Sequence, residues 1–363
     1  MATPRPDIFK KYLDLEQPND QVFCTYVFVD ASMETLRSKM LVLNYEPVSA
    51  TECPEASFCG KGTDQWRDAG DDSELCLVPV ALFRDPFLLG RNKLVLCEVL
   101  NADLKPNETN TRHSCLKGME EARDQEPWFG IEQEYVLFGR DGIPLGWTVK
   151  DQALERFQTY FYAVGAGNTA GRQVADAHIK ACSYAGVKLY GSNAEAVLSQ
   201  WEYQIGPLPG IAAGDHLWIS RYILQRVAED FDVVVSFDPR PFQNKHLPGS
   251  AGHINFSTKA SRAEGGLEWI IKALEKLKLK HEQHLAAYDP RKSEPNQERL
   301  KSGSLATPTR EYVAGFSSKL VCLRVPRVTV ERGKGFFEDR RPGANVEPYR
   351  AMQTLVETLC LAS

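Results

Sequence analysis

Two acidic stretches decide the fold: WFGIEQEY at residues 128–135 and NAEAVLSQWEYQIGP at residues 193–207. In the first stretch, Glu132 and Glu134 are two residues apart in a run of aromatic and β-branched residues that predicts a β-strand. Successive side chains of a strand point to opposite faces, so residues two apart share a face. The pattern therefore predicts a strand that places two carboxylates side by side.

Further acidic residues and one histidine fall in other short, strand-like segments. Carboxylates with one imidazole suit hard divalent cations such as Mg²⁺ or Mn²⁺, and three protein ligands per ion leave positions open for phosphate. Most glutamates are solvated surface charges and a lone histidine is usually structural, so the hypothesis depends on the whole set. The six candidate ligands, enough for two three-ligand sites, are Glu132, Glu134, Glu195, Glu202, His253 and Glu338.

The segments that precede these stretches predict a smaller domain. VFCTYVFVD at residues 22–30 and KLVLCEVL at residues 93–100 are strand-like, and Gly, Pro and charged residues crowd the interval between them. We expect a mostly β domain with long loops over residues 1–106. A second domain is expected over residues 107–363.

The second domain combines short strands with long helices. Apolar residues recur at helical spacing over residues 171–186, 214–231 and 266–288, whereas GVKLYG, QWEYQIG and VVVSFDP are strand candidates. The fold class is therefore expected to be α+β, with antiparallel strands and helices in the larger domain.

Two polar features are expected at the surface. His281 and His284 are three residues apart on a Lys- and Glu-rich helix, a pattern that favours a solvated face over a metal site. Residues 289–309 are polar and interrupted by Pro and Gly. This composition is typical of a mobile surface loop or lid.

The composition of the 363-residue chain argues against several function classes. A formal net charge of -5 at pH 7 gives no reason to expect nucleic acid as a partner. The first twenty residues carry charges throughout, and no apolar run approaches the length of a membrane span, so we expect a cytoplasmic protein without a membrane partner. Nine scattered cysteines without a C-x-x-C pair are expected to be reduced and mostly buried.

Six segments resemble the signature segments of eukaryotic-type glutamine synthetase. They are WFGIEQEY, NAEAVLSQWEYQIGP, GDHLWISRYIL, FDPRP, GHINFSTKA and FFEDRRPGAN, and the similarity extends to FRDPF and KLVLCEV near the N-terminus. The resemblance implies a β-grasp domain followed by a catalytic domain with a funnel-shaped site. It also implies a homo-oligomer, a decamer of two pentameric rings, in which the neighbour's first domain completes each site.

The resemblance divides the six candidate ligands between two metals. Those matching the metal on the γ-carboxylate side are Glu134, Glu195 and Glu202, and those matching the metal on the ATP phosphates are Glu132, His253 and Glu338.

Other positions match the family's substrate contacts. Gly249 matches the backbone contact to the α-carboxylate of glutamate. Arginines match the cations that hold glutamate and the transferred phosphoryl group. The planar guanidinium group suits this task, because it can pair with two oxygens at once and stays charged at any working pH. These arginines are Arg299, Arg324 and Arg340. The nucleotide-contacting positions are Trp128, Asn255, Ser257, Arg324 and Phe336, the last in place of a tyrosine.

The chain departs from the family at the ammonium site. Where the family has an aspartate, a serine, a tyrosine and a flap glutamate, this chain has Cys59, Gly62, Phe161 and Leu305. Ammonium requires a carboxylate to bind the cation and to take its proton before attack, and these four side chains offer none. Lys319 replaces an arginine near the phosphates, which keeps the charge and loses the bidentate fork.

Intact metal and phosphate positions beside an altered ammonium site favour a ligase with a different acceptor. Such an enzyme would activate the γ-carboxylate of glutamate with ATP and Mg²⁺ or Mn²⁺, then join it to an amine other than ammonia to give a γ-glutamyl amide. Two alternatives remain open. One is a non-catalytic paralogue that keeps the ring and binds a ligand or partner, and the other is an ordinary glutamine synthetase with a relocated base.

Overall fold

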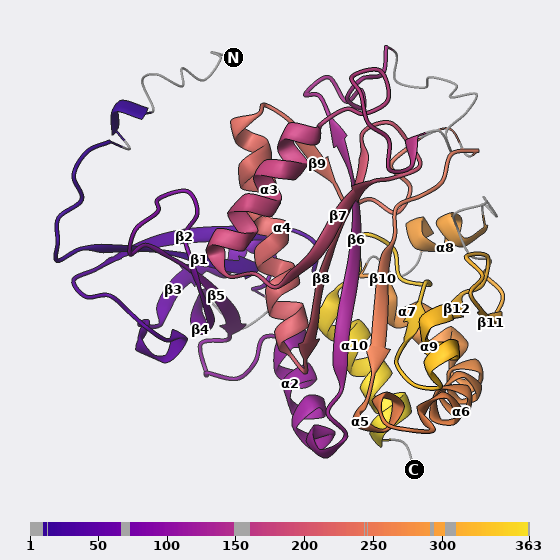
Figure 1. Cartoon of the computed structure of the whole chain (residues 1–363). Coiled ribbons are helices and arrows are strands. Elements are labelled where there is room, and N and C mark those ends of the chain that lie inside the picture. Colours follow the sequence, from indigo (N-terminus) through magenta and orange to yellow (C-terminus); the bar gives the residue numbers. More distant parts are fainter. Residues whose placement is uncertain are drawn as a thin grey trace.

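The computed structural model describes residues 10–12, 14–66, 73–148, 160–242, 244, 246–290, 294–301 and 310–361. Two β-sheets stand side by side in this part of the chain, with helices between them and around the second sheet (Figure 1). The N-terminal sheet, in indigo, lies on the left of this view. The α+β fold class expected from the sequence is therefore confirmed.

The first sheet has the strand order β2-β1-β5-β4-β3. At its centre β1 runs parallel to β5, and the other neighbouring strands pair antiparallel. Side chains alternate along β1: Cys24 and Tyr26 face a cluster within this sheet, whereas Val27 joins the main core of the molecule. The bounds are β1 (Val22–Val29), β2 (Leu36–Leu43), β3 (Ala56–Cys59), β4 (Glu74–Arg84) and β5 (Lys93–Leu100), with the 3₁₀ turns η1 (Ala50–Glu52) and η2 (Gly60–Thr63).

The second sheet contains the strands predicted around the two acidic stretches. Its order is β11-β12-β13-β10-β6-β8-β7, and β9 also pairs with β6. These pairs are antiparallel except β11 and β12, which run parallel. The bounds are β6 (Trp128–Phe138), β7 (Leu189–Ala194), β8 (Gln200–Pro209), β9 (Val234–Ser236), β10 (Gly252–Ser257), β11 (Ala314–Phe316), β12 (Leu323–Val325) and β13 (Phe337–Asp339).

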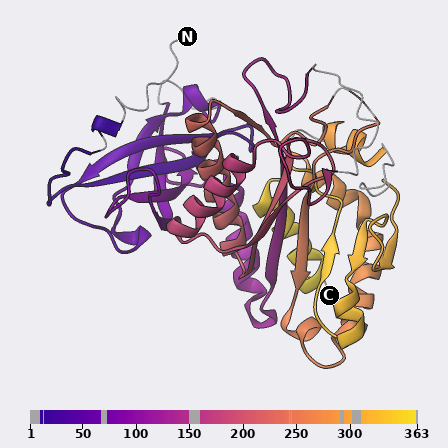
Figure 2. The same cartoon turned by 45° about the horizontal axis from the view of Figure 1, so that its top comes forward.

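Two long helices, α3 and α4, lie between the sheets in both views (Figures 1 and 2). Leu217 and Leu224 of α4 share one core cluster with Val27 and Leu94 of the first sheet and Tyr203 of the second. Burial of this apolar surface, at about 25 cal/mol per Å², holds the two sheets together. The helices are α2 (Thr111–Glu121), α3 (Arg172–Ala185), α4 (Ala212–Asp230), α5 (Lys259–Arg262), α6 (Gly266–Leu279), α7 (His281–Tyr288), α8 (Glu294–Lys301), α9 (Arg327–Arg332) and α10 (Pro348–Val356), with the 3₁₀ turn η3 (Arg123–Gln125) and a final π-helical turn (Glu357–Leu361).

The third long helix expected from the sequence is interrupted at Lys280, where α6 ends and α7 begins. The expectation of a solvated face for His281 and His284 is wrong, because both are buried. The ring nitrogens of His284 lie 2.7 Å from the hydroxyl of Tyr288 and 2.8 Å from that of Thr358. His281 and His284 follow the buried Leu277 of α6 at helical spacing, four and seven residues later, so both continue the buried face of that helix despite their charged neighbours.

Part of the polar segment 289–309 forms helix α8 instead of the expected loop or lid. The expectation is wrong for these residues, and the rest of the segment lies mostly outside the described part of the chain. Asn296 donates from Nδ2 to the carbonyl of Arg341 over 3.0 Å, and Arg299 donates from Nη2 to the same carbonyl over 2.7 Å. Polar contacts hold this helix, and hydrophobic periodicity does not detect such a helix.

All nine cysteines are free thiols, and six of them are buried. Cys59, at the end of β3, is exposed. In the described residues, no helix combines the length and the apolar character needed to cross a bilayer.

Candidate functional site

The register of the second sheet brings the predicted metal ligands together. Glu132 on β6 is paired with His253 on β10, and Glu134 on β6 is paired with Glu202 on β8. Glu195 directly follows β7 and begins the turn that leads into β8. Residues two apart on β6 thus lie beside partners on two different neighbouring strands, a pairing that the two-residue spacing alone does not specify.

The first cluster consists of Glu134, Glu195 and Glu202. All three side chains are buried, and one oxygen from each lies within 4.8 Å of the others. Burial raises the pKa of Glu195 and Glu202 well above the usual range, and the neighbouring carboxylates raise it further. Burial likewise raises the pKa of Glu134 to about 7. Three crowded carboxylates fit a hard divalent cation, whose charge would offset their mutual repulsion.

The second cluster consists of Glu132, His253 and Glu338, again with ligand atoms within 4.8 Å of one another. Nδ1 of His253 lies 3.4 Å from Oε2 of Glu132 and 3.4 Å from Oε1 of Glu338. Burial, together with Arg340, lowers the pKa of His253 well below its ordinary value. The imidazole is therefore neutral at pH 7, the form that ligates a metal. Asn255 fixes Glu132 by donating from Nδ2 to Oε1 over 2.8 Å.

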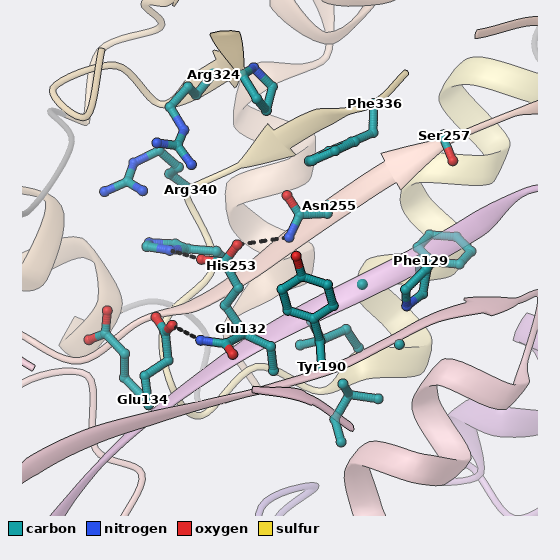
Figure 3. Close-up of a pocket in the computed structure, with 18 of the residues that line it drawn as sticks. Phe129, Glu132, Glu134, Tyr190, His253, Asn255, Ser257, Arg324, Phe336 and Arg340 are labelled. Carbon is teal, nitrogen blue, oxygen red and sulfur yellow. Dashed lines mark hydrogen bonds and ion pairs between the residues drawn. The ribbon is translucent and has the colours of Figure 1, made fainter. Parts of the chain in front are cut away.

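Two arginines meet at the fully buried carboxylate of Glu338. Nη1 of Arg340 donates to Oε1 over 2.7 Å, and Nε of Arg324 donates to Oε2. Figure 3 shows both arginines on the same side of the pocket, close to His253. Glu338 therefore orients two positive charges toward a cavity that also contains carboxylate clusters.

Both clusters open onto one cavity of about 780 Å³. In Figure 3, Glu134 lies at one end of this pocket and Ser257 at the other, with Glu132 and His253 between them. The predicted residues that line the cavity are Trp128, Glu132, Glu134, Phe161, Glu195, Glu202, His253, Asn255, Ser257, Lys319, Arg324, Phe336 and Arg340. One cavity thus brings together the predicted metal, phosphate and nucleotide positions.

Gly249 and Arg299 lie behind the wall of this cavity. Nη2 of Arg299 donates to the backbone carbonyls of Arg340 and Pro342, over 3.2 and 3.1 Å. A side chain at Gly249 would place its Cβ 2.3 Å from the carbonyl oxygen of Pro239, so only glycine fits. Neither residue is among those that line the cavity.

The four predicted acceptor residues are not gathered in one place. Phe161 lines the cavity, and Nζ of Lys319 lies 5.6 Å from the centroid of its ring. Cys59 and Gly62 are exposed on the first sheet and do not line this cavity, while Leu305 lies outside the described residues. The backbone N–H of Lys61, followed by the Ser73 hydroxyl, lowers the pKa of the Cys59 thiol.

Several residues that line the cavity were not identified from the sequence, among them Arg262, Tyr162 and Tyr190. The guanidinium carbon of Arg262 lies 4.3 Å from the centroid of the Trp128 ring, and its Nη1 donates to the Ser257 hydroxyl over 3.0 Å. Tyr162 and Tyr190 also line the cavity although they are 66% and 82% exposed. A basic residue soon after the GHINFS segment was the one available signal for Arg262. The tyrosines gave no signal, because loop and edge-strand aromatics have no periodicity to mark them.

Comparisons with known proteins match most of the chain. Residues 109–359 match the family model described as glutamine synthetase, catalytic domain. The chain is 45% identical to a glutamine synthetase of Xenopus laevis over 353 residues, which cover 97% of this chain and 88% of the relative. It is 44% identical to a glutamine synthetase of Homo sapiens over 350 residues, covering 96% of this chain and 92% of the relative. The chain therefore belongs to the glutamine synthetase family and is of the eukaryotic type.

Proposed function

We propose that this chain uses ATP to activate the γ-carboxylate of glutamate and passes the activated group to an amine. The observation that carries the proposal is the single cavity onto which both three-ligand clusters open, beside two arginines that share Glu338. Phosphoryl transfer needs little covalent help from a protein, because its main requirements are alignment and neutralisation of negative charge. This cavity offers groups for both tasks.

The nucleotide is proposed to bind at the Ser257 end of the cavity. Phe336 and the Trp128 ring, against which Arg262 stacks, offer flat surfaces for a base. Arg324 and Arg340 would then face the phosphates, where each guanidinium can pair with two oxygens. Divalent cations held by the two clusters would neutralise phosphate charge and orient the γ-carboxylate when bound.

Glutamate is proposed to lie near Gly249 and Glu134. Arg299, which the family resemblance assigns to substrate, donates here to the carbonyls of residues 340 and 342. Its proposed contribution is therefore twofold: it adds positive charge near Glu134 and fixes the segment that carries Arg340. Burial lowers the pKa of Arg299 to about 10, so the side chain stays charged at neutral pH.

For the acceptor, we propose an amine other than ammonium. Phe161 and Lys319 face the cavity, and neither offers the carboxylate that a small cation requires. Loss of such a carboxylate costs on the order of 2–5 kcal/mol, whereas an apolar amine would gain about 25 cal/mol per Å² of buried surface. The relatives carry the name glutamine synthetase, which by itself favours ordinary glutamine synthesis. That alternative and the non-catalytic one are outcomes of the experiment below.

The acceptor side is proposed to be shared between subunits of a homo-oligomer. Cys59 and Gly62 are remote from the cavity of their own chain, so a neighbour would have to bring them to it. The first sheet also ends in the edge strand β2, where Met40 and Val42 are 49% and 53% exposed. A closed ring covers such edges. The resemblance suggests two pentameric rings, in the cytoplasm.

The test is phosphate release with glutamate, ATP and Mg²⁺, using ammonium, hydroxylamine, and alkyl and aryl amines in turn. We expect release with hydroxylamine and apolar amines, weak or absent release with ammonium, and none from Glu338→Gln. A variant combining Cys59→Asp with Leu305→Glu should gain ammonium use. Robust glutamine synthesis by the wild type would contradict the altered acceptor, and no release with any amine would favour the non-catalytic paralogue.

A further inference from the structure

The buried glutamine at the start of β8 contacts both the first cluster and the Gly249 segment. Gln200 is 2% exposed. Its amide nitrogen Nε2 lies 3.1 Å from Oε2 of Glu134, 3.1 Å from the carbonyl oxygen of Gly249 and 3.1 Å from the hydroxyl of Ser250. One side chain thus spans two parts of the site that are far apart in sequence.

The chemistry of the partners fixes the orientation of this amide. A carboxylate and a backbone carbonyl can only accept hydrogen bonds, so the NH₂ group must face them and the amide oxygen must point away. Oε2 of Glu134 accepts a second bond from the backbone N–H of Ala251 over 2.9 Å. Two donors therefore hold one oxygen of Glu134, which leaves Oε1 outside both bonds.

The backbone of Gln200 contacts a second member of the cluster. Its carbonyl accepts a hydrogen bond from the N–H of Glu195 over 2.9 Å, and its own N–H donates to the carbonyl of Val197 over 2.9 Å. Ser199 completes this tight turn with a φ of 75°, the left-handed region. Glu202, the third carboxylate, follows two residues later on the same face of β8. Gln200 thus contacts the carboxylate of Glu134 and the backbone of Glu195, and shares a strand face with Glu202.

We infer that Gln200 is a positioning residue that couples the first metal cluster to the glutamate segment. The inference rests on the proposed function, which assigns a cation to Glu134, Glu195 and Glu202 and glutamate to the Gly249 segment. Three buried carboxylates repel one another, so their geometry needs donors that hold them in place. Because the same amide also holds the Gly249 carbonyl, its loss should weaken metal and glutamate binding together and leave nucleotide binding largely unchanged.

The test compares Gln200→Met with Gln125→Met. Methionine has a similar length and no amide donor, and Gln125 donates one hydrogen bond to the carbonyl of Cys360, away from the cavity. Mn²⁺, glutamate and ATP binding are measured by calorimetry, with circular dichroism as the check of folding. Gln200→Met should weaken Mn²⁺ binding at one site at least tenfold and glutamate binding severalfold, with ATP affinity within twofold of wild type. Gln125→Met should leave all three unchanged.

Two outcomes overturn the inference: a folded Gln200→Met variant with wild-type Mn²⁺ and glutamate affinity, or equal losses in Gln125→Met. If Gln200→Met does not fold, Gln200→Asn keeps the amide and shortens its reach, and the same losses are expected. Failure of the proposed function itself looks different. In that case the wild-type protein binds no Mn²⁺ and releases no phosphate, whatever occupies residue 200.

Discussion

Arg341 and Asp339 form a fully buried bidentate pair at the end of β13, with Nη2 2.6 Å from Oδ2 and Nε 2.9 Å from Oδ1. Between these two residues lies Arg340, and directly before them lies Glu338. Because alternate residues of a strand face opposite sides, the pair anchors β13 from behind while Glu338 faces the second cluster. The hydroxyl of Tyr288 also donates to Oδ2 of Asp339 over 2.6 Å.

The first prediction concerns this anchor. Tyr288→Phe removes the hydroxyl and leaves buried groups on Asp339 and His284 without that partner, so it should reduce the free energy of unfolding by about 1–3 kcal/mol. Tyr190→Phe is the matched control and should stay within about 0.5 kcal/mol of wild type, because Tyr190 is 82% exposed. Urea denaturation measures both. Equal stability of the two variants would contradict a supporting role for the Tyr288 hydroxyl.

The second prediction concerns pH. Burial lowers the pKa of His178 to about 4, below the ordinary value of 6.5. Between these values the unfolded chain binds a proton that the native protein does not, so this contribution to stability is present above pH 6.5 and is lost as pH falls toward 4. Buried carboxylates with raised pKa values have the opposite effect on the pH dependence of stability. The prediction therefore compares the free energies of unfolding of a variant and the wild type at each pH.

The free energy of unfolding of His178→Gln, taken relative to that of wild type, should rise by about 2 kcal/mol when the pH is lowered from 7 to 5. This change is expected whatever the stability of the variant at pH 7. His113→Gln alters an exposed histidine on α2 and should follow the wild-type curve. Denaturant unfolding measures the free energy of unfolding of each variant relative to wild type at pH 7 and at pH 5. A His178→Gln curve parallel to wild type would show that the native protein protonates this histidine normally.

The third prediction concerns metal dependence. EDTA-treated protein should bind ATP at least tenfold more weakly than protein with Mg²⁺, because phosphate charge would then face the carboxylates of the second cluster, Glu132 and Glu338, uncompensated. Glu338→Gln should reproduce part of this loss, and Glu268→Gln, on the exposed side of α6, should not. Calorimetric titration with ATP is the measurement. An ATP affinity that is the same with and without Mg²⁺ would argue against a working metal site.

The fourth prediction concerns assembly. Sedimentation should give a closed oligomer at micromolar concentration, and a combined Met40→Asp and Val42→Asp variant should weaken it, because the charges would be buried at the proposed contact along β2. Lys272→Asp, at an exposed position on α6, tests whether added charge alone has this effect. A wild-type species of 40.7 kDa would contradict the shared acceptor side.

Much of the site could be predicted because its ligands lie on strands. The two-residue spacing of Glu132 and Glu134 fixes their common face, and the sheet register then pairs them with His253 and Glu202. The family resemblance supplied the partner strands, which no single-segment pattern specifies. The boundary between residues 106 and 107 stays a prediction.

The two errors have different physical causes. Charged neighbours predict a solvated face for His281 and His284, but both histidines follow Leu277 at helical spacing and lie on the buried face. Helix α8 was expected to be a loop because it has no apolar stripe, yet Arg299 and Asn296 hold it through backbone carbonyls. For α8, contacts from distant segments override the local pattern, whereas for the two histidines the local apolar spacing indicated burial more reliably than the charge of their neighbours.

Transfer of an isotope shows whether ATP activates the γ-carboxylate of glutamate as an acyl phosphate. Glutamate labelled with ¹⁸O in the γ-carboxylate is incubated with protein, ATP, Mg²⁺ and hydroxylamine, and the released phosphate is analysed by mass spectrometry. Attack of the amine on an acyl phosphate expels phosphate that keeps one carboxylate oxygen. We expect one ¹⁸O in each phosphate from the wild type and no labelled phosphate from Glu338→Gln. Unlabelled phosphate, or none at all from a folded wild-type protein that binds ATP, would contradict it.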